Sequence, residues 1–244
     1  MKLYVFSFLL LFIVPSCLAD ETKPPVFSWE NPTTLYFKGN VSKDNFRLMQ
    51  EEMKKHKNSI ETLIISSGGG ETTGGLMFGN FVREHQIDVV VRILCASSCA
   101  NYVFTGAKSV YLEAGAIVGW HGGALQDTSD QIENFPEENK LMMRQSMADW
   151  CSAESAFFAA INKPQEMLIW GQLFSQQKNF SDEIQLWTYS LMDLQNLGFD
   201  VTAEDKEIAV MNETVGHIAA ILPVTSELLS FSRSCKEALE LTFN

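Results

Sequence analysis

A serine and a histidine stand at the ends of two predicted strands, where they could carry out acyl-transfer chemistry. Ser98 lies in a small-residue turn, 96–98, after a strand predicted over 88–94. His121 ends a strand predicted over 116–121, within Gly-Trp-His-Gly-Gly. A serine hydroxyl attacks a carbonyl when a neighbouring base takes its proton. We therefore expect Ser98 to be the nucleophile and His121 its general base.

Backbone donors for the oxyanion of such a reaction are also present. The amide of Cys99 opens a predicted short helix, so it would point toward a developing negative charge. Gly68 and Gly69 follow the short buried strand at 62–65, and glycines there allow a second amide to come close to a reacting carbonyl. The same space would let an extended substrate pair beside the strand.

Strands and helices alternate along the chain, which predicts a parallel sheet flanked by helices. The reactive positions follow strands directly, and the carboxyl ends of strands are where ligands bind in such sheets. The predicted strands cover 34–38, 62–65, 88–94, 109–112 and 116–121. The predicted helices cover 43–57, 73–84, a short stretch to 105 and 134–162, with helical segments continuing to about 197.

Three segments in this order carry a family resemblance: Ser67-Gly68-Gly69-Gly70, Cys95-Ala96-Ser97-Ser98-Cys99-Ala100 and Ile117-Val118-Gly119-Trp120-His121. They resemble the proteolytic subunit of the Clp protease and its superfamily, which includes signal peptide peptidase A and the crotonases. More closely, the chain resembles exported Clp-protease-like proteins of bacteria, whose serine motif has paired cysteines. The resemblance covers roughly residues 33 to 202. It implies a Clp protease/crotonase-like α/β fold and a C-terminal helical extension beyond it.

The resemblance also implies roles for particular residues. Ser98 would be the nucleophile, His121 the base, and the oxyanion hole would come from the amides of Gly68 or Gly69 and of Cys99. The family's usual proline in the glycine turn is replaced by Gly68.

The family's third triad member, an aspartate, falls on Leu186 when the following segment is aligned on Tyr189-Ser190. Asp182, or else Glu183, would substitute if the loop is longer. Otherwise the chain has a Ser-His dyad, or has lost activity, because an unoriented imidazole is a poor base.

The leading hypothesis is a serine hydrolase, a peptidase, acting on a peptide or other acyl substrate through an acyl-enzyme at Ser98. No cofactor is required. The alternative is a non-catalytic exported binding protein on the same fold, in which Ser98 only caps a helix. Crotonase chemistry on acyl-coenzyme A fits poorly, since those thioesters are not expected outside the cytoplasm.

Export is predicted from the first 19 residues, which have a basic start, an apolar run and small residues before Asp20. The rival interpretation is a lipoprotein signal with Cys17 as the lipidated residue. The mature protein should be soluble, since no second stretch approaches the length of a spanning helix. We expect an irregular lead-in over 20–33, a Clp-protease-like domain over 34–202 and a C-terminal extension over 203–244.

Four cysteines remain after the signal, and an even number in an exported chain suggests disulfides. Three pairings are possible from the sequence alone. A bond between Cys95 and Cys99 would brace the serine turn, and Cys151 would then pair with Cys235. The rival interpretation is that Cys95 and Cys99 are reactive thiols.

Charge and motif content argue against other function classes. The net charge of −12 disfavours nucleic acid and anionic membranes as partners, because both need a basic face. The glycine run lacks the lysine of a phosphate loop, and the histidines lack a helical zinc-ligand pair. Relatives in the superfamily commonly form trimers or larger rings, so a homo-oligomer is possible.

Overall fold

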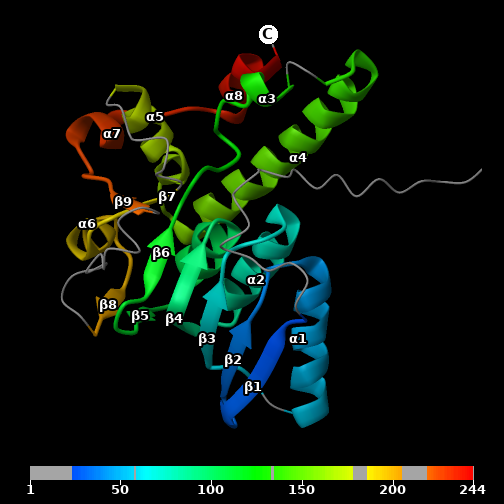
Figure 1. Ribbon diagram of the computed structural model, residues 1–244, viewed down its shortest axis with the longest axis vertical. Coiled ribbons are helices and arrows are strands. Elements are labelled where there is room, and N and C mark those ends of the chain that lie inside the picture. The colour runs from blue at the N-terminus through cyan, green and yellow to red at the C-terminus, as the bar shows by residue number, and fades with distance from the viewer. Residues whose placement is uncertain (1–23, 58, 133–134, 178–185, 205–218, 244) are drawn as a thin grey trace, which may run out of the picture.

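The computed structural model describes residues 24–57, 59–132, 135–177, 186–204 and 219–243. Over these residues the chain is an α/β structure with a mainly parallel sheet and flanking helices, as predicted. In Figure 1 the strands stand side by side and α2 and α4 lie behind them.

The main sheet has seven strands in the order β1-β2-β3-β4-β5-β8, and β6 pairs with β4 beyond the end of β5. Only the β1–β2 pair is antiparallel. The strands are β1 (Val26–Asn31), β2 (Thr34–Lys38), β3 (Thr62–Ser67), β4 (Asp88–Ala96), β5 (Val110–Leu112), β6 (Ile117–Gly119) and β8 (Val201–Ala203). A second sheet pairs β7 (Leu186–Thr188) with β9 (Ala219–Ile221) in parallel.

The described residues also form helices, most of which lie between two strands in the chain. They are α1 (Lys43–His56), α2 (Thr72–Glu84), the π-helix η1 (Cys99–Phe104), α3 (Ser129–Ile132), α4 (Glu137–Ile161), the 3-10 helix η2 (Gln165–Leu168), α5 (Trp170–Gln177), α6 (Leu191–Asn196), α7 (Ser226–Ser230) and α8 (Cys235–Phe243).

One face of the main sheet forms the core. Alternate residues of a strand point to opposite faces, and Leu63, Ile65, Val89 and Val91 are all buried against the helices. The pairing of β3 with β4 shifts register between Ile65 and Ser67. This irregularity lies just before the ends of the two strands, where the glycine turn and the serine turn begin.

Two stretches differ from the sequence-based expectation. The lead-in expected to be irregular contains β1, whose Phe27 and Trp29 pack on the core, because β1 pairs with β2. The stretch expected to be helical up to residue 197 contains β7. β2 follows β1 directly in the chain, and the prolines that flank β1 led to the irregular assignment. β7 pairs with the distant β9, so its local sequence does not reveal the strand.

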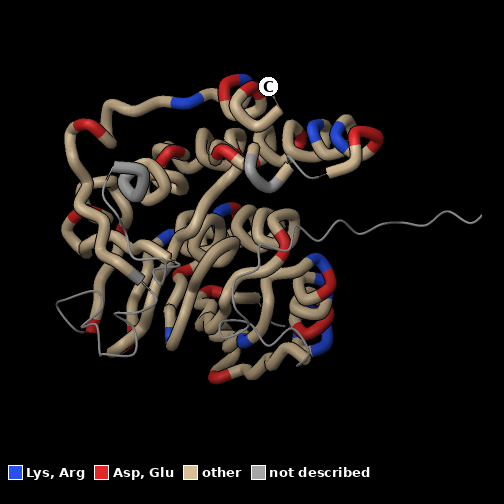
Figure 2. The backbone as a smooth tube through the Cα atoms, turned by 45° about the horizontal axis from the view of Figure 1, so that its top comes forward, with Lys and Arg blue, Asp and Glu red and all other residues tan. Residues whose placement is uncertain are grey.

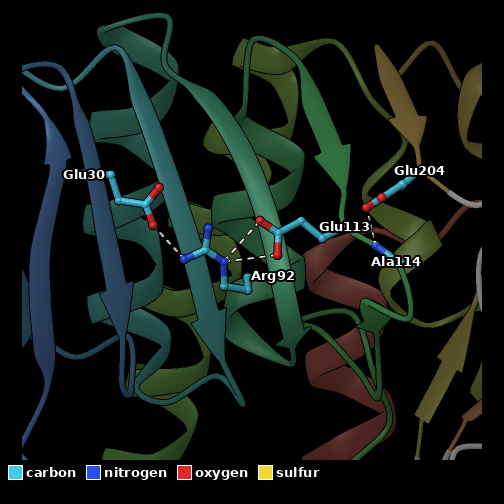
Figure 3. A network of polar contacts seen from close by, with 5 residues as sticks. All are labelled: Glu30, Arg92, Glu113, Ala114 and Glu204. Atoms are coloured by element: carbon cyan, nitrogen blue, oxygen red, sulfur yellow. Dashed lines mark hydrogen bonds and ion pairs between the residues drawn. The ribbon is translucent and has the colours of Figure 1, made fainter.

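The opposite face of the sheet is more polar and carries an ion-pair network (Figure 3). The guanidinium of Arg92 on β4 donates to Glu30 on β1 at 2.7 Å and to both oxygens of Glu113, which follows β5, at 3.1 Å. These hydrogen bonds raise the pKa of Arg92. Figure 2 shows charges of both signs mixed along α1.

The C-terminal helix is attached to the long helix α4. Cys151 on α4 and Cys235 at the start of α8 form a disulfide, as predicted. In Figure 1 the far end of α4 extends past the sheet and α8 lies beside it. Among the described residues, no helix has the length and apolar character needed to cross a membrane.

Replacing both Cys151 and Cys235 by alanine should destabilise the protein, because the disulfide restricts the unfolded chain across a separation of 84 residues. We expect the free energy of unfolding in urea to fall by about 2–4 kcal/mol. Ser232→Ala, an exposed substitution in the same segment, is the control and should leave the stability unchanged. An unaltered midpoint in the double variant would show that the bond adds no stability.

Candidate functional site

The serine turn forms where β4 gives way to η1. Ser97 lies between them with φ of +55°, a left-handed conformation that non-glycine residues adopt only when their surroundings hold them there. Its amide donates to the carbonyl of Gly119 at 2.9 Å, and its carbonyl accepts from the amide of Asn101 at 2.8 Å. The turn leaves the Ser97 side chain partly exposed at the end of the strand.

His121 reaches this turn from the neighbouring strand. β6 runs parallel to β4, so the carboxyl ends of the two strands lie together. Trp120 continues from β6 and forms backbone hydrogen bonds in both directions with Trp187 of β7. Nε2 of His121 lies 2.6 Å from Oγ of Ser97. The described structure therefore contains a hydrogen-bonded Ser-His pair.

The serine of this pair is Ser97, so the prediction that His121 pairs with Ser98 is wrong. Ser98 is 3% exposed, and its hydroxyl donates to the carbonyl of Gly70 at 3.0 Å. The physical reason is the left-handed turn at Ser97, which directs the first serine toward His121 and the second toward the glycine turn.

The glycine turn after β3 packs directly against the serine turn. Gly69 has φ of +107°, and a Cβ built there would lie 2.6 Å from the Cβ of Ser97 and 2.8 Å from the carbonyl of Ala96. Only glycine allows this approach. The contact places the predicted oxyanion loop beside Ser97.

The predicted oxyanion donors are not equivalent in this structure. The amide of Gly69 donates to the hydroxyl of Ser67 at 3.1 Å, so it already has a partner. Gly68 lies at the partly exposed tip of the same turn. Cys99 begins η1, two residues beyond Ser97, and the amide that directly follows the paired serine is that of Ser98.

A disulfide closes the serine turn. Cys95, in β4, and Cys99, in η1, are bonded and fully buried, as the sequence led us to expect. The alternative interpretation of these cysteines as reactive thiols does not fit a bonded, buried pair. The bond joins the two ends of a five-residue segment with Ser97 at its centre.

The third triad member is not found at the aligned position. Leu186, at the start of β7, is buried and packs against Ala96 and Gly119. Asp182 and Glu183 lie outside the described residues. Among the residues that the structure describes, no group of three or more His, Cys, Asp or Glu side chains is arranged to hold a metal ion.

Burial favours the neutral form of His121. Desolvation lowers the pKa of His121 below the 6.5 of a free imidazole. The imidazole is therefore neutral at pH 7, which is the form that can accept a proton from Ser97.

A buried network that the sequence analysis missed lies behind the pair. Glu154 of α4 accepts hydrogen bonds from the hydroxyl of Tyr102 at 2.6 Å, the amide of Ala124 at 2.8 Å and the side chain of Gln165 at 2.8 Å. The indole of Trp150 donates to the Tyr102 hydroxyl at 2.9 Å. One signal in the sequence could have revealed it: Glu154 occupies the apolar stripe of α4, in line with Met147, Cys151 and Phe158.

An apolar groove of about 390 Å³ lies between α2 and α4. It begins at Thr72 and Thr73, which directly follow the glycine turn, and Gly75 in the same helical turn packs against Ser98. Its lining is completed by Leu76, Met142, Met143, Ser146, Met147, Asp149, Trp150 and Ala153. The groove can accept apolar side chains, and methionines adapt readily to different shapes.

Comparisons with known proteins give distant structural likenesses only. No protein-family model matches the chain, and no curated protein matches it in sequence. Two structures of the membrane-bound stomatin-specific protease 1510-N are similar, each with 12% identity. One has a TM-score of 0.37 over 79% of this chain and 97% of that one, and the other, in complex with a substrate peptide, has a TM-score of 0.38 over 82% and 95%.

An enoyl-CoA hydratase from Bacillus anthracis is also similar, at 8% identity and a TM-score of 0.30, over 65% of this chain and 98% of that one. Likenesses this distant say nothing of the reaction of this chain, which must be considered from its own residues.

The lowered pKa of His121 predicts a pH-dependent stability. The unfolded chain, with an imidazole pKa of about 6.5, binds a proton more readily than the folded chain, so stability should fall as the pH drops below that value. His121→Gln removes the titration. We expect urea unfolding between pH 8 and pH 5 to show a steeper loss for the wild type than for the variant. Parallel curves for the two proteins would contradict the assignment.

Proposed function

We propose that the chain is a serine hydrolase that acts on peptides or other acyl substrates, with Ser97 as nucleophile and His121 as general base. The observation that carries the proposal is the 2.6 Å contact between Oγ of Ser97 and Nε2 of a neutral His121. A serine beside a neutral imidazole, held in a left-handed turn at a strand end, has the arrangement of an activated nucleophile.

In the proposed reaction, His121 accepts the proton of Ser97 as the oxygen attacks the substrate carbonyl. The carbonyl oxygen becomes an oxyanion, which backbone amides stabilise. With Ser97 as nucleophile, the amides of Ser98 and Gly68 are the proposed donors, in place of those of Cys99 and Gly69. His121 then protonates the leaving amine or alcohol, and water releases the acyl group from Ser97 by the reverse sequence.

A third group that orients His121 remains a proposal. Asp182 is the tentative candidate, and the chain otherwise works as a dyad. We also propose that the protein is exported. Two disulfides support an oxidising compartment. The proposed cleavage after residue 19 concerns residues that the structure does not describe.

Fluorophosphonate labelling, which requires an activated serine, can show whether Ser97 or Ser98 is the nucleophile. Ser97→Ala should abolish labelling, and His121→Ala should reduce its rate by about 10²-fold or more, since the proton acceptor is lost. Ser98→Ala should still label, and the loss of its hydrogen bond to Gly70 should cost only about 1 kcal/mol of stability.

Labelling that survives in Ser97→Ala but not in folded Ser98→Ala would overturn the choice of serine. No labelling of folded wild type would favour the non-catalytic binding protein instead.

The groove predicts a preference for apolar groups in the part of the substrate that reaches α2 and α4. Wild type should react faster with fluorophosphonates that carry long alkyl chains than with the ethyl compound, because the methionine lining removes the chain from water. Met142→Glu, which places a charge in the groove, should weaken this preference.

Met192→Glu is the matched control, because Met192 is an exposed methionine on α6, outside the groove. Equal rates for long and short alkyl compounds in the wild type would show that the groove does not select substrates.

A further inference from the structure

The carboxyl group of Glu154 links the two segments that carry Ser97 and His121. Its Oε2 accepts from the hydroxyl of Tyr102 in η1, the helix that begins two residues after Ser97. Its Oε1 accepts from the amide of Ala124, three residues after His121. One side chain on α4 therefore bonds to both segments, although one segment follows β4 and the other follows β6.

From this bridge we infer that Glu154 is a positioning residue, which holds Ser97 and His121 at their hydrogen-bonding separation without touching the substrate. The inference rests on the proposed function, because it concerns the same pair.

The packing around Glu154 leaves little freedom. The side chain is fully buried, and a Cβ built on Gly123 would lie 3.0 Å from its Oε1. Gln165 donates to Oε1 at 2.8 Å and in turn accepts from the hydroxyl of Ser155 at 2.7 Å. The carboxyl group of Glu154 is thus held by η2 as well as by α4. The segments of Ser97 and His121 therefore bond to a carboxyl group whose position is fixed.

Further hydrogen bonds couple the same segments. The side chain of Asn101, in η1, donates to the carbonyl of Gly122 at 2.9 Å. The side chain of Gln172 donates to the carbonyl of His121 itself at 3.2 Å. The backbone carbonyls of His121 and of the residue after it are therefore held from α5 and η1. Glu154 differs from these residues in that one side chain bonds to both segments.

The chemistry of the bridge calls for a carboxylate. Three donors converge on Glu154, and the Tyr102 hydroxyl already accepts from Trp150, so its own hydrogen is directed to Oε2. Burial raises the pKa of Glu154, and the bonds from Tyr102 and Gln165 oppose that rise. An amide at this position would turn a donor toward Tyr102 and leave the tyrosine hydrogen without its acceptor.

The test uses Glu154→Gln and Tyr102→Phe in the full mature chain, with Glu113→Gln as control. Tyr102→Phe removes one bond of the bridge and keeps the ring in place. Glu113 pairs with Arg92 on the polar face of the sheet, so Glu113→Gln makes the same chemical change away from the site. Stability is measured by urea unfolding, and the pair is followed by fluorophosphonate labelling and by ¹⁵N NMR of His121.

In the NMR experiment, Ser97→Ala defines the Nε2 resonance of an imidazole that has lost its serine partner. Glu154→Gln should shift the Nε2 resonance toward that position and slow labelling about 10- to 100-fold, with the dependence on probe concentration unchanged. Tyr102→Phe should act in the same direction with a smaller effect, and Glu113→Gln should match the wild type.

Wild-type labelling rates and an unshifted resonance in both folded variants would overturn the inference. If Glu154→Gln fails to fold, the same comparison in Tyr102→Phe decides. If wild type does not label at all, the proposed function fails, and the Nε2 resonance alone still decides whether Glu154 positions His121.

Discussion

The parallel pairing of β4 with β6 is the interaction on which the site depends. It aligns Cys95 with Val118 and Ala96 with Gly119, so the residues that follow the two strands leave the sheet at the same edge. The amide of Ser97 still bonds to the carbonyl of Gly119, one step beyond the strand pairing. Ser97 and His121, 24 residues apart in the chain, meet because the sheet register brings them together.

The sheet register alone does not orient the Ser97 side chain toward His121. The left-handed backbone conformation of Ser97 is also needed. A non-glycine residue in a left-handed conformation costs about 1–3 kcal/mol, and it persists where the surroundings determine it. Here the disulfide between Cys95 and Cys99 closes the segment, and Gly69 packs against Ser97 from the neighbouring turn. The Gly70 carbonyl, by accepting from Ser98, holds the second serine inside. These contacts together hold Ser97 in its left-handed conformation.

Much of the fold was predictable from the chain because its signals are local. Alternation of apolar strands with helical spacing predicted the parallel sheet, and the glycine and serine turns fell at strand ends as expected. β1 was missed since its stability comes from pairing with β2 and from the packing of Phe27 and Trp29. β2 follows β1 closely in the chain, so it was the prolines flanking β1 that favoured the irregular assignment.

The sequence assigned Ser98 to the pair with His121, whereas the serine that contacts His121 in the structure is its neighbour Ser97. Ser97 and Ser98 are adjacent and chemically identical, and only the φ angle of Ser97 decides which of them faces His121. A sequence pattern places the turn but does not specify that angle. Glu154 was overlooked because its role depends on Tyr102 and Ala124, which lie 52 and 30 residues away.

If Oγ of Ser97 is the reacting atom, a fluorophosphonate will modify that residue, and the modified serine can be mapped. The wild-type protein, reacted with a fluorophosphonate and digested, would be analysed by tandem mass spectrometry with fragmentation between the two serines. We expect the phosphonyl group on Ser97 and an unmodified Ser98. A phosphonyl group on Ser98 would contradict this expectation, as would a folded protein with no modified serine.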